Sequence, residues 1–136
     1  MRLRLAADDI LIGILYFAKD KLPEHKFTTS REKINKTFYR LKELYPDIMT
    51  KFTFRHRELY PDCHALNMTI SNLCCSGVLF FGCSMDMRYQ ICDSEHFKSN
   101  ISGVYNTYVK KLIEDAGFTE EYIKTVSDTF VELIMQ

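Results

Sequence analysis

Glycine is scarce and scattered in this sequence. The five glycines never cluster, and the chain has no Gly-x-Ser-x-Gly nucleophile elbow, no P-loop and no glycine-rich dinucleotide turn. These absences count against the hydrolases and nucleotide-binding enzymes that such motifs mark. Adjacent carboxylates occur only where we expect helix ends, and there they compensate the helix dipole or add surface charge. We therefore expect a non-enzymatic protein without a cofactor.

The chain also lacks a long hydrophobic run and a disulfide framework. The apolar stretch at residues 10–18 is far too short to span a bilayer, and two acids, Asp8 and Asp9, stand directly before it. A secretory signal would carry no acids at that place. The five cysteines are odd in number and sparse. We expect reduced thiols, a cytoplasmic location and no membrane contact.

No Cys-x-x-Cys pair is present, and this spacing is what makes a zinc site specific. A zinc ion would need three or four sulfur- and nitrogen-bearing side chains to converge. The candidates are Cys63, His64, Cys83, Cys92 and His96. The spacing leaves their convergence open, and we predict no metal site. Neighbouring Cys63 and His64 diverge by about 100° on a helix, which does not suit a nucleophile and its base.

What is present is a good supply of core residues. A length of 136 residues with 46% hydrophobic side chains suits one domain spanning residues 1–136. The pattern predicts an α+β fold, mainly α, with a small antiparallel sheet or hairpin and additional helices at both ends. We expect a core at about residues 8–92 and a C-terminal helical pair at about residues 94–135.

Capping residues and apolar periodicity place the helices. We expect a central, most buried helix at residues 8–22 capped by Asp8, and a helix at residues 30–45 started by a capping box of Thr29 and Glu32. Asp62 is expected to cap a third helix, at residues 63–76, which Gly77 ends.

The remaining pattern predicts strands and the C-terminal pair. Alternating apolar and polar residues predict strands at residues 52–55 and 87–91, and a short apolar run predicts a buried strand at residues 78–81. A long helix is expected at residues 94–116, and Thr119 starts the last one.

The segment from Leu66 to Ile91 resembles the second half of a winged helix-turn-helix domain. In that superfamily a recognition helix ends in a small-residue, glycine and apolar turn, and then runs into a strand, a wing and a return strand. Here the parts are residues 66–76, Gly77 with residues 78–80, a turn at residues 82–85 and residues 87–91. The resemblance implies a winged-helix-like core and the capacity to read DNA with the recognition helix. It also implies that the C-terminal helices serve dimerisation.

The neutral chain divides into two oppositely charged halves. Residues 1–58 hold 13 basic and 8 acidic side chains, a net +5, and residues 59–136 hold 5 basic and 10 acidic, a net −5. A basic region with interleaved rings suits contact with phosphates. The candidate nucleic-acid-binding residues are Arg31, Lys33, Lys36, Arg40, Lys42, Arg55, Arg57, Asn67, Asn72 and Arg88.

Two functions remain open at this point. The first is a small regulatory protein that binds double-stranded DNA and acts as a homodimer. The second is a protein–protein adaptor or assembly subunit with the same fold and no DNA contact. The helix at residues 63–76 contains no Lys or Arg, which favours the adaptor, and the +5 half favours the DNA-binding regulator.

Overall fold

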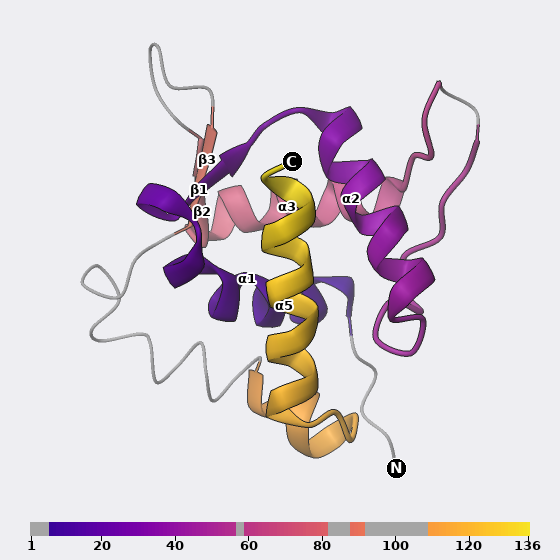
Figure 1. Ribbon diagram of the computed structural model, residues 1–136, viewed down its shortest axis with the longest axis vertical. Coiled ribbons are helices and arrows are strands. Elements are labelled where there is room, and N and C mark those ends of the chain that lie inside the picture. Colours follow the sequence, from indigo (N-terminus) through magenta and orange to yellow (C-terminus); the bar gives the residue numbers. More distant parts are fainter. Residues whose placement is uncertain (1–5, 57–58, 82–87, 92–108) are drawn as a thin grey trace.

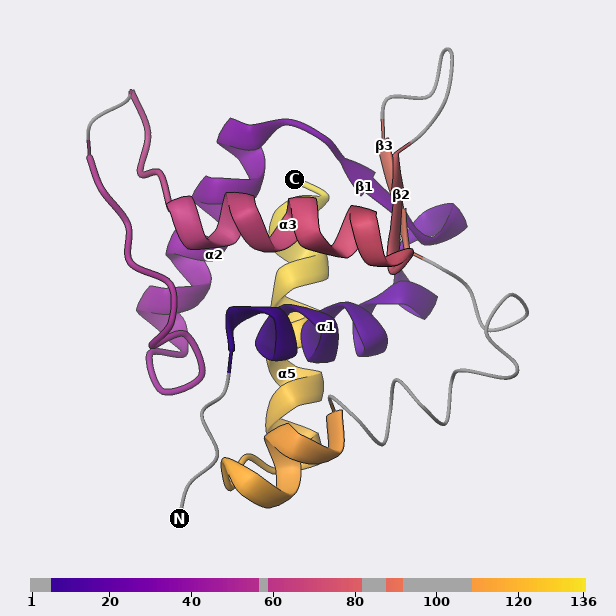
Figure 2. The same ribbon diagram turned by 180° about the vertical axis from the view of Figure 1, so that it is seen from behind.

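The fold is mainly helical, with one small antiparallel sheet at its edge (Figures 1 and 2). The computed structural model describes residues 6–56, 59–81, 88–91 and 109–136. Its longer elements are α1 (Ala7–Ala18), β1 (Lys26–Thr28), α2 (Arg31–Leu44), α3 (His64–Ser76), β2 (Leu79–Phe81), β3 (Arg88–Ile91) and α5 (Glu120–Ile134). The predicted fold class, α+β and mainly α, is confirmed.

Helix α1 lies at the centre of the core and contacts both α3 and α5. Its buried side chains include Ile10, Leu11, Ile14 and Leu15. The predicted cap, Asp8, is wrong. The backbone N–H of Ala6 donates instead to Asp9 Oδ2 at 3.1 Å, because a carboxylate at the third helical position can reach back to the helix start. A 3₁₀ turn (Lys19–Lys21) follows Ala18, so the regular helix is shorter than predicted.

The caps of α2 and α3 each lie one residue after the predicted position. Ser30, not Thr29, caps α2, and its hydroxyl accepts a first-turn backbone N–H at 3.2 Å. Cys63, not Asp62, caps α3, and its Sγ accepts a first-turn N–H at 3.4 Å. Gly77 ends α3 in the left-handed conformation at φ 82°, as predicted.

The sheet has the strand order β1-β3-β2, and both pairs are antiparallel. Tyr89 of β3 lies opposite Phe27 of β1 and Phe81 of β2, with ring centroids 5.6 and 5.8 Å apart. The predicted strands at residues 78–81 and 87–91 correspond to β2 and β3. The prediction that the first of them is buried is wrong, because Phe80 and Phe81 of β2 are exposed. Residues 82–87 lie outside the described part. Strand β1 was not predicted, because three residues carry too little alternation.

The strand predicted at residues 52–55 is wrong. Between α2 and α3 the chain forms a connection in which Ile48, Met49 and Phe52 are fully buried. Its one β pairing among the described residues is an isolated bridge between Arg55 and Asp62. The alternation around Phe52 therefore reflects two rings that pack on the core, Phe52 fully and Phe54 partly buried, and not a strand.

Helix α5 packs against α1 and α2 in the same core (Figure 1). Thr119 caps it, as predicted, and Phe130 is fully buried against the rings of Phe27 and Phe38 at 5.8 and 5.4 Å. The helix predicted at residues 94–116 falls mostly on residues 92–108, which lie outside the described part. The described end of that segment is a π-helical turn (Lys111–Asp115).

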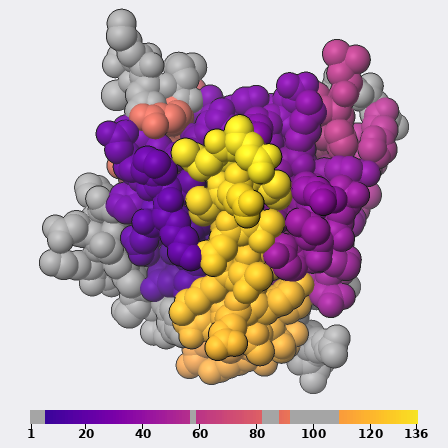
Figure 3. Space-filling model, viewed as in Figure 1, coloured from indigo at the N-terminus to yellow at the C-terminus, as the bar shows by residue number. Residues whose placement is uncertain are grey.

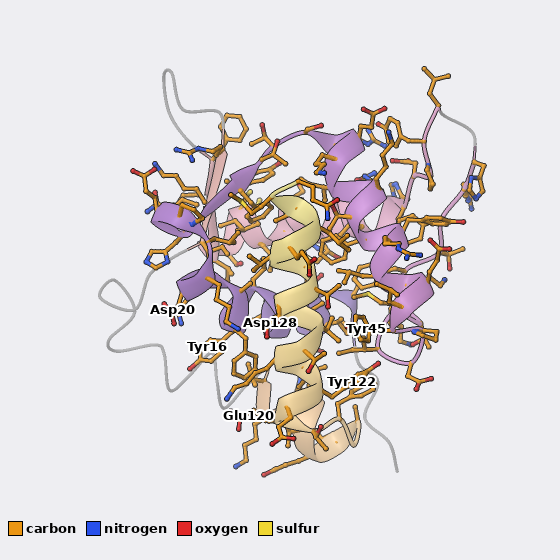
Figure 4. All side chains as sticks on the ribbon, viewed as in Figure 1. Tyr16, Asp20, Tyr45, Glu120, Tyr122 and Asp128 are labelled. Carbon is orange, nitrogen blue, oxygen red and sulfur yellow. The ribbon has the colours of Figure 1, made fainter. Side chains whose placement is uncertain are left out.

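Polar contacts hold the two flanks of α5. Figure 4 shows Tyr45 and Tyr122 on the α2 side, where the Tyr45 hydroxyl lies 2.7 Å from Thr129 Oγ1. On the α1 side, Asp128 forms an ion pair with Lys21. Thr129 and Asp128 therefore fasten α5 to the segments on either side of it.

Candidate functional site

A polar cluster joins the start of α2 to the start of α3. Arg31 donates to both carboxylate oxygens of Asp62, from Nε at 3.2 Å and from Nη2 at 3.0 Å. Asn67 Nδ2 also donates to Asp62 Oδ1 at 3.1 Å. The hydrogen bonds from Arg31, aided by the one from Asn67, lower the pKa of the Asp62 carboxyl, against an opposing effect of burial. The carboxylate side chain is 19% exposed and the Arg31 side chain 60%, so the pair presents its cation to solvent.

Buried Asn35 completes this cluster from beneath. Its Nδ2 donates to the Arg31 carbonyl and to Asn67 Oδ1, both at 2.9 Å, and its Oδ1 accepts the Cys63 backbone N–H at 2.8 Å. Two of these three hydrogen bonds, those with Asn67 and Cys63, tie α2 to the N-terminus of α3. The sequence analysis did not identify Asn35. Its place beside Ile34 on the apolar side of the helix does indicate a buried amide that needs hydrogen-bond partners.

A groove of about 400 Å³ opens beside this cluster, between the start of α2, α3 and the sheet. Its lining residues are Thr29, Arg31, Ile34, Asn67, Ile70, Ser71, Cys74, Phe81 and Tyr89. The walls are apolar where α3 faces the sheet and polar at the Arg31 end. Phe81 is 54% exposed, which is unusual for a large ring and leaves one wall open to a partner.

The thiol and phenol in the groove are poor nucleophiles. Burial raises the pKa of the Cys74 thiol and of the Tyr89 hydroxyl, and burial also raises the pKa of Cys63. All three groups therefore stay protonated near neutral pH. The groove is better suited to binding than to covalent chemistry.

The outer face of α3 carries no Lys, Arg, Asp or Glu. Its exposed side chains are His64, Met68, Ser71, Asn72, Cys75 and Ser76. Met68 is 49% exposed. In Figure 2 this helix lies in front and α5 behind, and Figure 1 shows the reverse, so the two helices occupy opposite sides of the molecule.

Among the ten candidate residues, three cations form one ridge on α2. Lys33, Lys36 and Arg40 follow one another at helical spacing and lie roughly opposite the flank that carries Arg31, at about 100° per residue. Lys36 pairs with Glu32 at 3.6 Å, and Arg40 pairs with Glu43 at 3.7 Å. The ridge is therefore a solvated helix face with local acids, turned away from the groove.

The other candidates lie elsewhere. Lys42 Nζ donates to the Phe52 carbonyl at 2.5 Å, and Arg88 pairs with Glu24 at 3.0 Å. Arg88 alternates with Tyr89 along β3, so it points to the face of the sheet away from the groove. Arg55 is exposed on the connection before α3, and Asn72 is exposed on α3. Arg57 lies outside the described residues.

The basic helix α2 and the acidic helix α5 pack against each other in the fold. Helix α2 carries five basic and two acidic side chains, a net +3, and α5 carries one basic and four acidic, a net −3. The two helices pack side by side, as the yellow and purple surfaces in Figure 3 show. The excess of positive charge on α2 therefore lies next to an equal excess of negative charge on α5.

In the part of the chain that the structure describes, no group of three or more His, Cys, Asp or Glu side chains could hold a metal ion. Of the zinc candidates, Cys63 caps α3 and His64 begins it, whereas Cys83, Cys92 and His96 lie outside the described residues. Nor does any described helix have the length and apolarity needed to cross a bilayer.

No family model matches the chain, and comparison with curated proteins and with solved structures gives no significant match.

Proposed function

We propose that this chain is a non-enzymatic protein–protein adaptor or assembly subunit, built on a winged-helix-like core, that holds part of a protein partner in the groove between α2, α3 and the sheet. The observation that carries the proposal is the pairing of an open aromatic wall, Phe81, with an uncharged α3 face beside it. Interaction sites combine exposed aromatic and Met side chains with few charges at their centre.

The order of elements supports the winged-helix-like core. Helix α3 ends at Gly77 and leads into the antiparallel strands β2 and β3, with β1 on the far side of β3. The connection between α2 and α3 is longer than that superfamily normally has. Free thiols at Cys63, Cys74 and Cys75 support a reducing, cytoplasmic setting. Homodimerisation stays a prediction, and light scattering on the full chain measures it.

A phage-displayed library of short random peptides tests the adaptor. Peptides selected on the wild-type chain should bind about ten-fold more weakly to Phe81→Ala, because the substitution removes one wall of the groove. Phe80→Ala is the matched control, since Phe80 is similarly exposed and points to the opposite face of the same strand. Selected peptides that bind both variants as tightly as wild type would refute a groove-based adaptor.

Binding to double-stranded DNA is the second candidate, and the ridge of Lys33, Lys36 and Arg40 favours it. Heparin and duplex DNA retention should then fall steeply between low and moderate salt. The double substitution Lys36→Glu/Arg40→Glu should abolish it, and Lys124→Glu, on the outer face of α5, should not. Absence of salt-dependent retention in the wild type at low ionic strength would exclude this candidate.

A further inference from the structure

We infer that the groove of one copy of this chain receives Leu59 of a second copy, in a symmetric dimer whose two α3 helices lie antiparallel against each other. This inference rests on the proposed function as an assembly subunit and names the partner of the same groove. It follows from what lies at the two ends of α3 and from the absence of charge along that helix.

The anchor of this contact is Leu59, on the connection that leads into α3. Its side chain is 101% exposed, whereas the other exposed large apolar side chains that the structure describes are 43–54% exposed. The bridge between Arg55 and Asp62 joins the two ends of the segment that contains Leu59, through backbone hydrogen bonds of 2.7 and 2.9 Å. Leu59 therefore belongs to a segment that is anchored at its base, and its whole side chain is available to a partner.

The groove that would receive this leucine is apolar where α3 meets the sheet. Ile34 and Ile70 are nearly buried there, and Phe81 and Tyr89 have their ring centroids 5.8 Å apart. A volume of about 400 Å³ holds one bulky side chain and part of its backbone. The site therefore suits an aliphatic anchor such as Leu59.

Within one copy, the anchor and the sheet end of the groove lie at opposite ends of α3. The helix has 13 residues and is about 20 Å long, with the connection before its N-terminus and the sheet after its C-terminus. Figure 2 shows α3 across the front, with the connection beyond one end and the sheet beyond the other. A second α3 that lies antiparallel on the first brings each Leu59 to the sheet end of the other copy. The exchange is reciprocal, as a two-fold contact requires.

The outer face of α3 suits contact with its own copy. Near a two-fold axis a side chain lies close to its own counterpart, so a charge there would face a like charge. Helix α3 contains no Lys, Arg, Asp or Glu, and the exposed side chains near its middle are Met68, Ser71 and Asn72. Interface centres are depleted of charge and enriched in Met. A partner of another sequence does not need this neutrality, whereas a second copy does.

The last helix is less suited to the same kind of contact. Helix α5 carries four acidic side chains and one basic, so pairing α5 with its own copy would bring like charges together. The charge distribution therefore favours a dimer through α3 over one through the C-terminal helix.

The mass of the full-length chain, measured by analytical ultracentrifugation over a range of micromolar concentrations, tests the inference. The wild type should be a dimer. Leu59→Ser should raise the dimer dissociation constant about ten-fold, because it removes the anchor, and Phe81→Ala should do the same from the groove side. Leu44→Ser is the matched control, since Leu44 is 44% exposed at the end of α2 and lies outside the contact.

Met68 tests the contact between the helices independently of the groove. It is exposed close to the middle of α3, so in the dimer it lies within about one turn of its counterpart. Met68→Glu and Met68→Lys should each weaken self-association, and the loss should diminish at high salt. An equimolar mixture of the two variants should form a mixed dimer, because opposite charges then face each other. Thermal unfolding of each variant confirms that the monomer is folded.

The other outcomes overturn the inference. They are a monomeric wild type, a dimer that keeps its mass in both Leu59→Ser and Phe81→Ala, and a dimer that is indifferent to charge at Met68. Peptide selection separates these results from the adaptor function, because a peptide that needs the groove should bind Leu59→Ser more tightly than the self-paired wild type. Peptides that depend on Phe81 but bind both proteins equally would leave the adaptor standing without a second copy in its groove. A monomeric chain whose selected peptides ignore Phe81 would remove both proposals.

Discussion

The side chains of Asn35 and Asn67 are joined amide to amide, with Asn35 Nδ2 2.9 Å from Asn67 Oδ1. Asn35 is fully buried in α2, and Asn67 is half-buried on α3. Because Asn67 also donates to Asp62, the amide pair connects the interior of the molecule to the exposed Arg31 at the rim of the groove. The orientation of α3, and so the shape of the groove, depends on this polar connection.

Replacing Asn35 with Ala should destabilise the protein by about 2–3 kcal/mol, since it leaves the buried Cys63 N–H without an acceptor and takes a donor from the half-buried Asn67 Oδ1. Urea unfolding followed by circular dichroism measures this loss. Asn72→Ala is the matched control: Asn72 is exposed on α3, and its loss should lie within about 0.5 kcal/mol. Equal effects from the two substitutions would contradict the role assigned to Asn35.

The helical skeleton could be predicted from the sequence because its determinants are local. Periodic apolar residues identified α2 and α3, and Gly77 marked the end of α3 through its own backbone preference. The sequence did not determine which single residue caps each of these helices. Adjacent Thr29 and Ser30 are both competent caps, and it is Ser30 that accepts the Lys33 N–H in the structure.

The groove and the failed strand depend on contacts distant in sequence. Phe52 alternates with polar neighbours like a strand residue, but its ring packs against Phe38, and no strand of the described residues lies beside it. The groove brings together Arg31, Asn67 and Phe81 from three separate elements, and no local pattern marks that meeting. Counting charges along the chain likewise does not show that four of the candidate cations each pair with an acid: Arg31, Lys36, Arg40 and Arg88.

Stability should fall at acidic pH partly because of Asp62. Its pKa in the folded protein lies below the ordinary value of 3.8, chiefly because of the hydrogen bonds from Arg31. The ionised carboxylate therefore stabilises the fold above that ordinary value, and this contribution is lost as the pH falls through the lower, folded-state pKa. Unfolding curves from pH 6 to pH 2 should show a smaller acid-induced loss for Asp62→Asn than for wild type. Parallel pH profiles for the two proteins would contradict this prediction.

Gly77→Ala should destabilise the protein by about 1–2 kcal/mol, measured by urea unfolding. Gly77 ends α3 at φ 82°, and a side chain there is strained even though a Cβ would meet nothing within 4 Å. Gly77→Asn should cost less, since Asn tolerates the left-handed conformation better than Ala does. If Ala and Asn cost the same, the loss has another origin than backbone conformation.

At Gly13 of α1, an added methyl group should not bring the gain in stability that alanine usually brings to a helix. A Cβ there would collide with Leu112 Cδ1, and Leu112 is fully buried, so it has little room to move. Alanine normally favours a helix over glycine by about 1 kcal/mol, but overpacking costs about 1–3 kcal/mol, so Gly13→Ala should be neutral to destabilising where an exposed helical site would gain. Leu112→Val removes the colliding atom. In a double-mutant cycle, the second substitution should therefore cost less in the Gly13→Ala background than in wild type, and additive effects would show that the two side chains do not compete for the same space.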